Sequence, residues 1–178
     1  PATSAVHVIV RLRQARSKHD TERSGFLCRS EPSAVPSKDV RTDDTNLIEL
    51  VAAHHMLADQ ALVETAGLSR DQWCRLLRND IWVQVTPGQW RHRATPLTWE
   101  MSVHAGSSWL GKRAALYGHT AAAWWGLDGC ARHDVEFLVP RSRRHLPPWL
   151  TLHTTKEWSR GDVLLHNDIR TASATRAI

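Results

Sequence analysis

Apolar residues recur every three or four positions between residues 45 and 66, which predicts two helices in this stretch. Thr45 is the expected N-cap of the first helix, which continues to His55. The second helix is expected over residues 59–66. Gly67 is placed to end it, because glycine adopts the left-handed conformation of a helix terminus at little cost.

A third helix is expected over residues 70–79, with Ser69 as its N-cap. Its apolar positions are spaced so that they form one buried stripe, and they are Trp73, Leu76 and Leu77. Most of the remaining positions carry arginine or amide side chains. We therefore expect the outward side of this helix to be polar and cationic.

After Asp80 the spacing of apolar residues changes to two, which predicts a β-hairpin. Its strands are expected over residues 81–85 and 89–92, with Pro87-Gly88 in the turn. Helix, helix, helix and hairpin in this order are typical of a winged helix-turn-helix, which we expect over residues 45–94.

The segments on either side of this predicted domain differ from it in character. Residues 1–44 mix charges of both signs with Ser, Thr and Pro, and we expect a disordered tail because few apolar groups are present to offset the ordering entropy. Residues 95–178 predict a second, small α+β domain. Its expected elements are a helix capped by Thr98, a helix ending at Trp125, and strands over 135–139, 150–154 and 163–169.

The fold class expected for the whole chain is therefore α+β, with an N-terminal winged helix-turn-helix followed by this second domain. No closing element follows the last predicted strand before Ile178, which suggests that the second domain is truncated.

The net charge of +5 and the pI near 9.6 favour a polyanionic partner, although the same charge would also serve solubility alone. In a helix-turn-helix the second helix of the motif lies in the major groove, and arginine matches guanine edges or phosphate oxygens. The candidate DNA contacts are Ser69, Arg70, Gln72, Arg75, Arg78 and Asn79 on the third helix, with Arg91 and Arg93 from the hairpin tip. A second basic cluster is interpreted as a further phosphate or partner contact, or as a solvated turn: Arg141, Arg143 and Arg144.

The sequence offers little enzyme chemistry. Its histidines lack cysteine or carboxylate partners at metal-ligand spacing, and His119 is expected to be buried or to cap a helix. Asp134 and Glu136 share one face of a predicted strand, where they could hold Mg²⁺, but a salt-bridged surface strand is the favoured interpretation. We expect no catalytic activity, no metal and no cofactor.

Three widely separated cysteines without a C-x-x-C spacing predict no disulfide framework. No apolar run approaches the about 20 residues that a membrane-spanning helix needs. We therefore expect a cytoplasmic protein with no membrane partner.

Three segments of this chain resemble AbiEi-type antitoxins, the DNA-binding halves of AbiE type IV toxin–antitoxin systems, especially those of actinobacteria. The segments are LVETAGLSRDQWCRLLRNDIWVQVTPGQWR (62–91), HTAAAWWGLDG (119–129), and VEFLVPRSRRHLP (135–147) with IRTASATRAI (169–178). Thr120 and Ala174 depart from the serine and proline usual in that family.

The resemblance implies a sequence-specific repressor that binds repeats in its own promoter and counters a nucleotidyltransferase-like toxin. In one branch, relatives continue into a very-short-patch-repair-like nuclease domain. The alternative function is therefore the DNA-targeting part of such an endonuclease, with the catalytic domain absent from this chain. A third interpretation is a pure protein-binding module.

Overall fold

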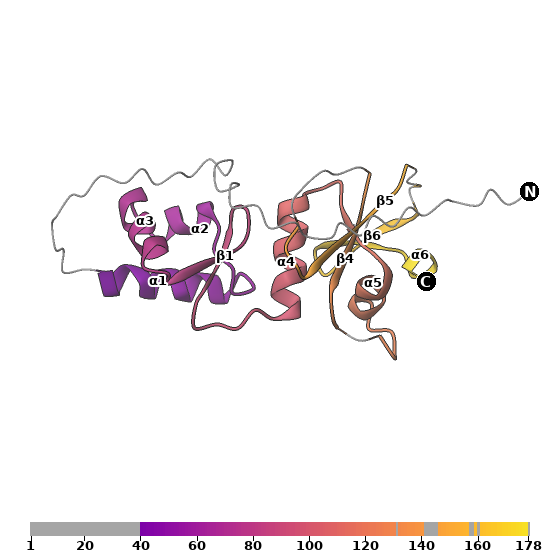
Figure 1. Cartoon of the computed structure of the whole chain (residues 1–178), viewed down its shortest axis with the longest axis horizontal. Helices are drawn as coiled ribbons and strands as arrows, with labels where there is room; N and C mark the ends of the chain where they lie inside the picture. The colour runs from indigo at the N-terminus through magenta and orange to yellow at the C-terminus, as the bar shows by residue number, and fades with distance from the viewer. Residues whose placement is uncertain (1–39, 131, 141–145, 157–158, 160, 178) are drawn as a thin grey trace, which may run out of the picture. The chain divides into compact units, whose positions relative to one another are not determined.

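The described chain is α+β and falls into two compact units, residues 40–97 and 98–177 (Figure 1). The computed structural model describes residues 40–130, 132–140, 146–156, 159 and 161–177. Most of the predicted tail, residues 1–39, lies outside this part of the chain. The boundary at residue 44 is wrong, because residues 40–44 form the start of a helix.

The first unit contains three helices and a two-stranded hairpin. Its helices are α1 (Val40–Ala52), α2 (Gln60–Thr65) and α3 (Arg70–Arg78), and its strands are β1 (Trp82–Thr86) and β2 (Gln89–His92). Thr45 lies inside α1, so its expected role as N-cap is wrong. Hydrophobic periodicity could not locate this start, because no apolar residue lies between Val40 and Leu47.

The first helix was also expected to continue to His55, which is wrong because α1 ends at Ala52 and His55 has a positive φ. The ends of α2 follow the sequence signals. Asp59 caps α2, its carboxylate accepting from the backbone N–H of Leu62 at 2.9 Å. Gly67, at φ +79°, supplies the left-handed residue that turns the chain toward α3. Gly88, at φ +85°, does the same in the turn between β1 and β2, which pair in antiparallel fashion.

Three tryptophans join α3 to the hairpin. Trp73 of α3 is fully buried, and its ring lies 5.7 Å from that of Trp82 in β1 and 5.4 Å from that of Trp90 in β2. Backbone hydrogen bonds between Ala58 and Trp90 add the segment before α2 to the hairpin's other edge. The same core contains Leu47 and Val51 of α1, so all the elements of the unit share it.

Cys74 lies on the inner side of α3 and is disulfide-bonded. The odd number and wide spacing of the cysteines did not predict this bond, because chain separation carries no information about which Cα atoms approach to bonding distance.

The second unit is built on a five-stranded mixed sheet of order β5-β4-β3-β7-β6. Its elements are α4 (Trp99–Leu110), β3 (Ala115–Leu116), α5 (Gly118–Trp124), β4 (Val135–Val139), β5 (Leu150–Thr154), β6 (Val163–His166), β7 (Ile169–Ala172) and α6 (Ala174–Ala177). β3 pairs in parallel with β7 and antiparallel with β4, and β4 pairs in parallel with β5. Consequently the chain enters β3 at the end of the sheet where β4 and β5 finish.

A close approach fixes α4 on this sheet. A Cβ at Gly106 would lie 2.7 Å from the ring of Phe137, so only glycine leaves room for that side chain in the core. Trp124 of α5 meets Trp99 and His104 of α4, each at a ring separation of 5.7 Å. Both helices thus contribute to one apolar core with the sheet.

The predicted strand over 163–169 is confirmed only as far as His166, where β6 ends; a turn follows, and β7 returns antiparallel to β6 from Ile169. Asn167 and Asp168 form this turn with φ values of 45° and 61°. Asn and Asp tolerate this left-handed conformation, so the apolar pattern continues across a reversal of the chain. The two-residue strand β3 was missed because it is too short to show any periodicity.

We expect Trp73→Ala to lower the free energy of unfolding of the first unit by about 3–5 kcal/mol. The substitution leaves a large cavity where the indole ring of α3 packs against both strands. Urea titration followed by circular dichroism would measure the loss. Gln84→Ala, at an exposed position of β1, is the matched control. Equal losses in the two variants would contradict the role given to Trp73.

Candidate nucleic-acid interface

The start of α3 is fixed by a reciprocal capping box. The Ser69 hydroxyl accepts from the backbone N–H of Gln72 at 3.3 Å, and the Gln72 side-chain oxygen accepts from the backbone N–H of Ser69 at 2.8 Å. Two of the predicted DNA contacts therefore hold the first turn of the helix. This bonding orients the residues that follow them.

Three arginines of α3 reach its surface: Arg75 and Arg78 lie away from the buried stripe, whereas Arg70 is exposed because it begins the helix. Arg70 and Arg78 are exposed and Arg75 is half-buried. Arg75 and Arg78 are three positions apart, so they project from neighbouring places on the helix surface. The Arg78 Nε donates to the carbonyl of Cys74 at 3.3 Å, and its terminal nitrogens form no further hydrogen bond within the described chain. Asn79 is exposed and forms the C-cap.

The hairpin arginines are not at the tip, where the sequence analysis placed them. The tip is the exposed Pro87-Gly88 turn, and pairing of Trp82 with His92 puts Arg91 and Arg93 at the opposite end of the hairpin. The error arose because β2 begins directly after the turn and leads away from it.

Arg91 and Arg93 have different surroundings. The Arg91 guanidinium donates to the carbonyls of His92, Arg93 and Thr95, so it fastens the chain that leaves β2. Arg93 forms an ion pair with Asp80 at 3.4 Å, and both side chains are largely exposed. An exposed pair of this kind contributes little to stability, so Arg93 can exchange its partner at small cost.

The candidate interface is thus smaller and more mixed in charge than predicted. Its cations are Arg70, Arg75, Arg78 and Arg93, and the exposed carboxylates of Asp71 and Asp80 lie among them in the sequence. The second predicted cluster, Arg141, Arg143 and Arg144, falls outside the described residues.

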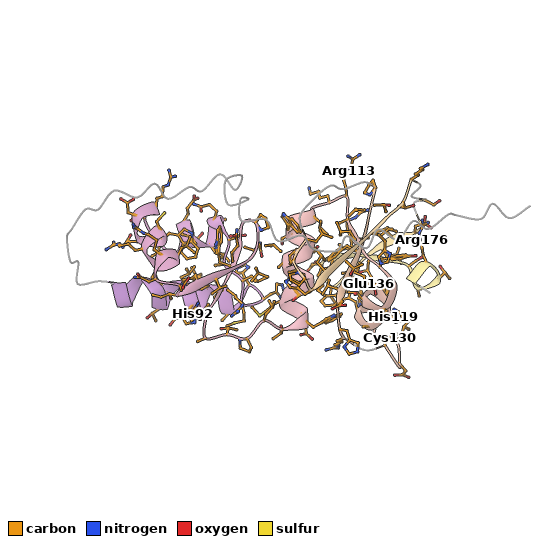
Figure 2. The ribbon with its side chains drawn as sticks, viewed as in Figure 1. His92, Arg113, His119, Cys130, Glu136 and Arg176 are labelled. Carbon is orange, nitrogen blue, oxygen red and sulfur yellow. The ribbon has the colours of Figure 1, made fainter. Side chains whose placement is uncertain are left out.

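The second unit has a polar cluster centred on Glu136, near the start of β4 (Figure 2). The carboxylate lies 2.7 Å from Nε2 of His153 in β5 and 3.7 Å from Nδ1 of His119 in α5. The hydrogen bond with His153 is the largest cause that lowers the pKa of Glu136, and it outweighs the opposing effect of burial. The expected surface strand is instead half-buried at this position, and His119, expected to be buried or capping, is exposed.

Thr120 explains how α5 begins beside β4. Its hydroxyl donates to the carbonyl of Asp134 at 3.1 Å and accepts from the backbone N–H of Glu136 at 2.8 Å. These groups face β3, whose last pairing is the bond from the N–H of Tyr117 to the carbonyl of Glu136. The hydroxyl therefore replaces the backbone partner that β4 loses where β3 ends.

In the described part of the chain, no three His, Cys, Asp or Glu side chains are arranged to hold a metal ion. No serine, threonine or cysteine side chain bonds to His153 within those residues. The geometry is that of a carboxylate tying β4, β5 and α5 together.

We expect Glu136→Gln to destabilise the second unit near neutral pH, with a difference from the wild type that disappears as the solution is acidified. When the pKa of a carboxylate is lower in the folded state, the charged group stabilises the fold at pH above its unfolded-state pKa of about 4.3. This stabilisation is lost as the pH falls through the folded-state pKa. Urea titrations between neutral and strongly acidic pH would measure this difference. A difference that stays constant over that range, or that is equally large with His153→Ala already present, would contradict the assignment.

Comparisons with known proteins show a remote likeness to a solved structure. No protein-family model matches the chain, and no curated protein matches it. Among solved structures, it is similar to the crystal structure of RV2827C protein from Mycobacterium tuberculosis, with a TM-score of 0.44 and 20% identity. The match covers 66% of this chain and 46% of that one, so the chain spans less than half of that neighbour's length. Within the described residues, no helix combines the length and apolar character needed to cross a membrane.

Proposed function

We propose that residues 40–97 form a winged helix-turn-helix that binds double-stranded DNA, with α3 in the major groove. The observation that carries this proposal is the two-sided character of α3. Trp73 and Leu76 anchor one side in the core, while Arg75 and Arg78 lie away from it and Arg70 is exposed at the start of the helix. The capping box fixes the first turn, from which a recognition helix contacts base edges.

The order of elements supports the same assignment. α2, the turn at Gly67 and α3 correspond to the two helices and turn of the motif, and the hairpin follows directly as the wing. In this arrangement Arg93, at the base of the hairpin and beside Asp80, contacts a phosphate by leaving its exposed ion pair. Arg91 supports the wing from within.

We further propose that the chain is an antitoxin-like transcriptional autorepressor, with operator repeats and a nucleotidyltransferase-like toxin as its partners. This rests on the resemblance of three segments to AbiEi-type antitoxins. A reporter gene under the chain's own promoter tests the repressor: its expression should fall when the chain is present. Unchanged expression would contradict autorepression.

We expect Arg75→Ala and Arg78→Ala each to weaken binding to the promoter duplex. If the arginine reads a base, its loss should cost about 1–3 kcal/mol of binding free energy and change the sequence preference at one position. If it contacts a phosphate, affinity should fall equally for all sequences, and the slope of log K against log salt should decrease by about 1. Fluorescence anisotropy over a series of salt concentrations would separate these outcomes.

Arg132→Ala is the charge-matched control, because Arg132 is exposed and paired with Glu100 in the second unit. Binding that does not depend on salt, or equal losses in all three variants, would end the proposal.

A further inference from the structure

The lysines and arginines of the second unit differ in whether a carboxylate neutralises them. Six of them belong to the described residues. Two are paired, Arg132 with Glu100 and Arg176 with Asp162. The other four are exposed and form no ion pair within the described chain: Lys112, Arg113, Lys156 and Arg170.

The strand register places these four at one end of the sheet. Lys112 and Arg113 form the turn that precedes β3, and Lys156 follows the end of β5. Ala115 pairs with Leu138 and Val139 with Thr154, so the start of β3 and the end of β5 lie at the same level. β7 runs parallel to β3, which brings Arg170, near its start, to this end as well.

The two paired arginines do not add to this charge. Arg132 precedes the start of β4, at the opposite end of the sheet, and Figure 2 likewise shows Arg113 on the side of the unit away from Cys130. Arg176 follows β7, and its guanidinium is held by Asp162 and, at 3.5 Å, by the hydroxyl of Thr155.

Little negative charge opposes the four exposed cations. Asp168, in the turn between β6 and β7, is the one described carboxylate in the segments that carry them. Asp162 is already neutralised by Arg176. Among the described residues, four cations therefore face solvent at this end of the sheet against a single unpaired carboxylate.

We propose that this cationic end, defined by Lys112, Arg113, Lys156 and Arg170, is a second contact for the phosphate backbone of duplex DNA. The inference rests on the proposed function of the first unit. Neighbouring strands lie about 4.8 Å apart, so the three spacings from β5 to β7 spread the cations over about 14 Å. B-DNA carries one charge per about 1.7 Å of its axis, so about eight phosphates occupy that length.

The surroundings of Lys112, Arg113 and Lys156 fit phosphate better than a protein. The turn Gly111-Lys112-Arg113 and the segment Thr155-Lys156 contain no large apolar side chain. Beside Arg170 the surface is more apolar, because Leu165 of the edge strand β6 pairs with it and is 69% exposed. A stable protein interface needs a desolvated apolar centre, whereas phosphate contacts need only accessible cations. Such contacts add affinity without sequence preference.

The test uses the full chain and a duplex of random sequence, with the dissociation constant measured over a series of salt concentrations. Lys112→Ala/Arg113→Ala should reduce the slope of log K against log salt by about 2, one for each phosphate that is no longer neutralised. Lys112→Arg/Arg113→Lys, which preserves charge, and Arg132→Ala, which removes a paired cation at the other end, should keep the wild-type slope. Both substituted residues are exposed, so an unchanged thermal unfolding midpoint verifies the fold.

If Lys112→Ala/Arg113→Ala keeps the wild-type slope of log K against log salt, this inference is overturned. An acidic protein as the partner of the surface would give that result. If Arg75→Ala/Arg78→Ala still weakens binding in that case, the proposed function stands without the second contact. Absence of any duplex binding by the wild type at low salt would overturn both.

Discussion

The packing of Trp73 between the two strands of the hairpin is the contact on which the arrangement of the first unit depends. α3 has only nine residues, and a helix of this length is marginal in water without tertiary support. The rings of Trp82 and Trp90 give it that support from both strands. The indole N–H of Trp73 has no hydrogen-bond partner among the described residues, so the contribution of this side chain comes from apolar area and ring contacts.

This anchoring determines what the rest of α3 can do. Since one side of the helix is committed to the core, the arginines on the other side are presented at fixed positions, and the Ser69–Gln72 box fixes the first turn. A rigid helix that displays guanidinium groups is suited to bind a polyanion with defined geometry, because little conformational freedom is lost on binding. The proposed DNA contact therefore follows from packing as much as from charge.

The second unit uses polar groups where the first uses aromatic ones. Thr120 replaces a missing strand partner, and Glu136 joins β4, β5 and α5 through two histidines. Glutamate is tolerated in this half-buried position because its oxygens are paired. The cationic end of the sheet is a product of the topology, since Lys112 and Lys156, which are far apart in the sequence, reach the same level of β3 and β5, the two strands that flank β4.

The sequence by itself determined the local elements whose signals are short-range: the capping box at Ser69, the glycine at position 67, the apolar stripe of α3, and the strands 135–139 and 150–154. The helix signals depend on residues within one or two turns of each other, and the strands depend on an alternating pattern of apolar residues. Only the tertiary structure decided which arginines are accessible. Arg91 is used by neighbouring carbonyls, Arg93 lies at the base of the hairpin, and the cationic end of the sheet is assembled from separate segments. The physical reason is that a side chain's partners are set by register and by strand order, which no periodicity along the chain encodes.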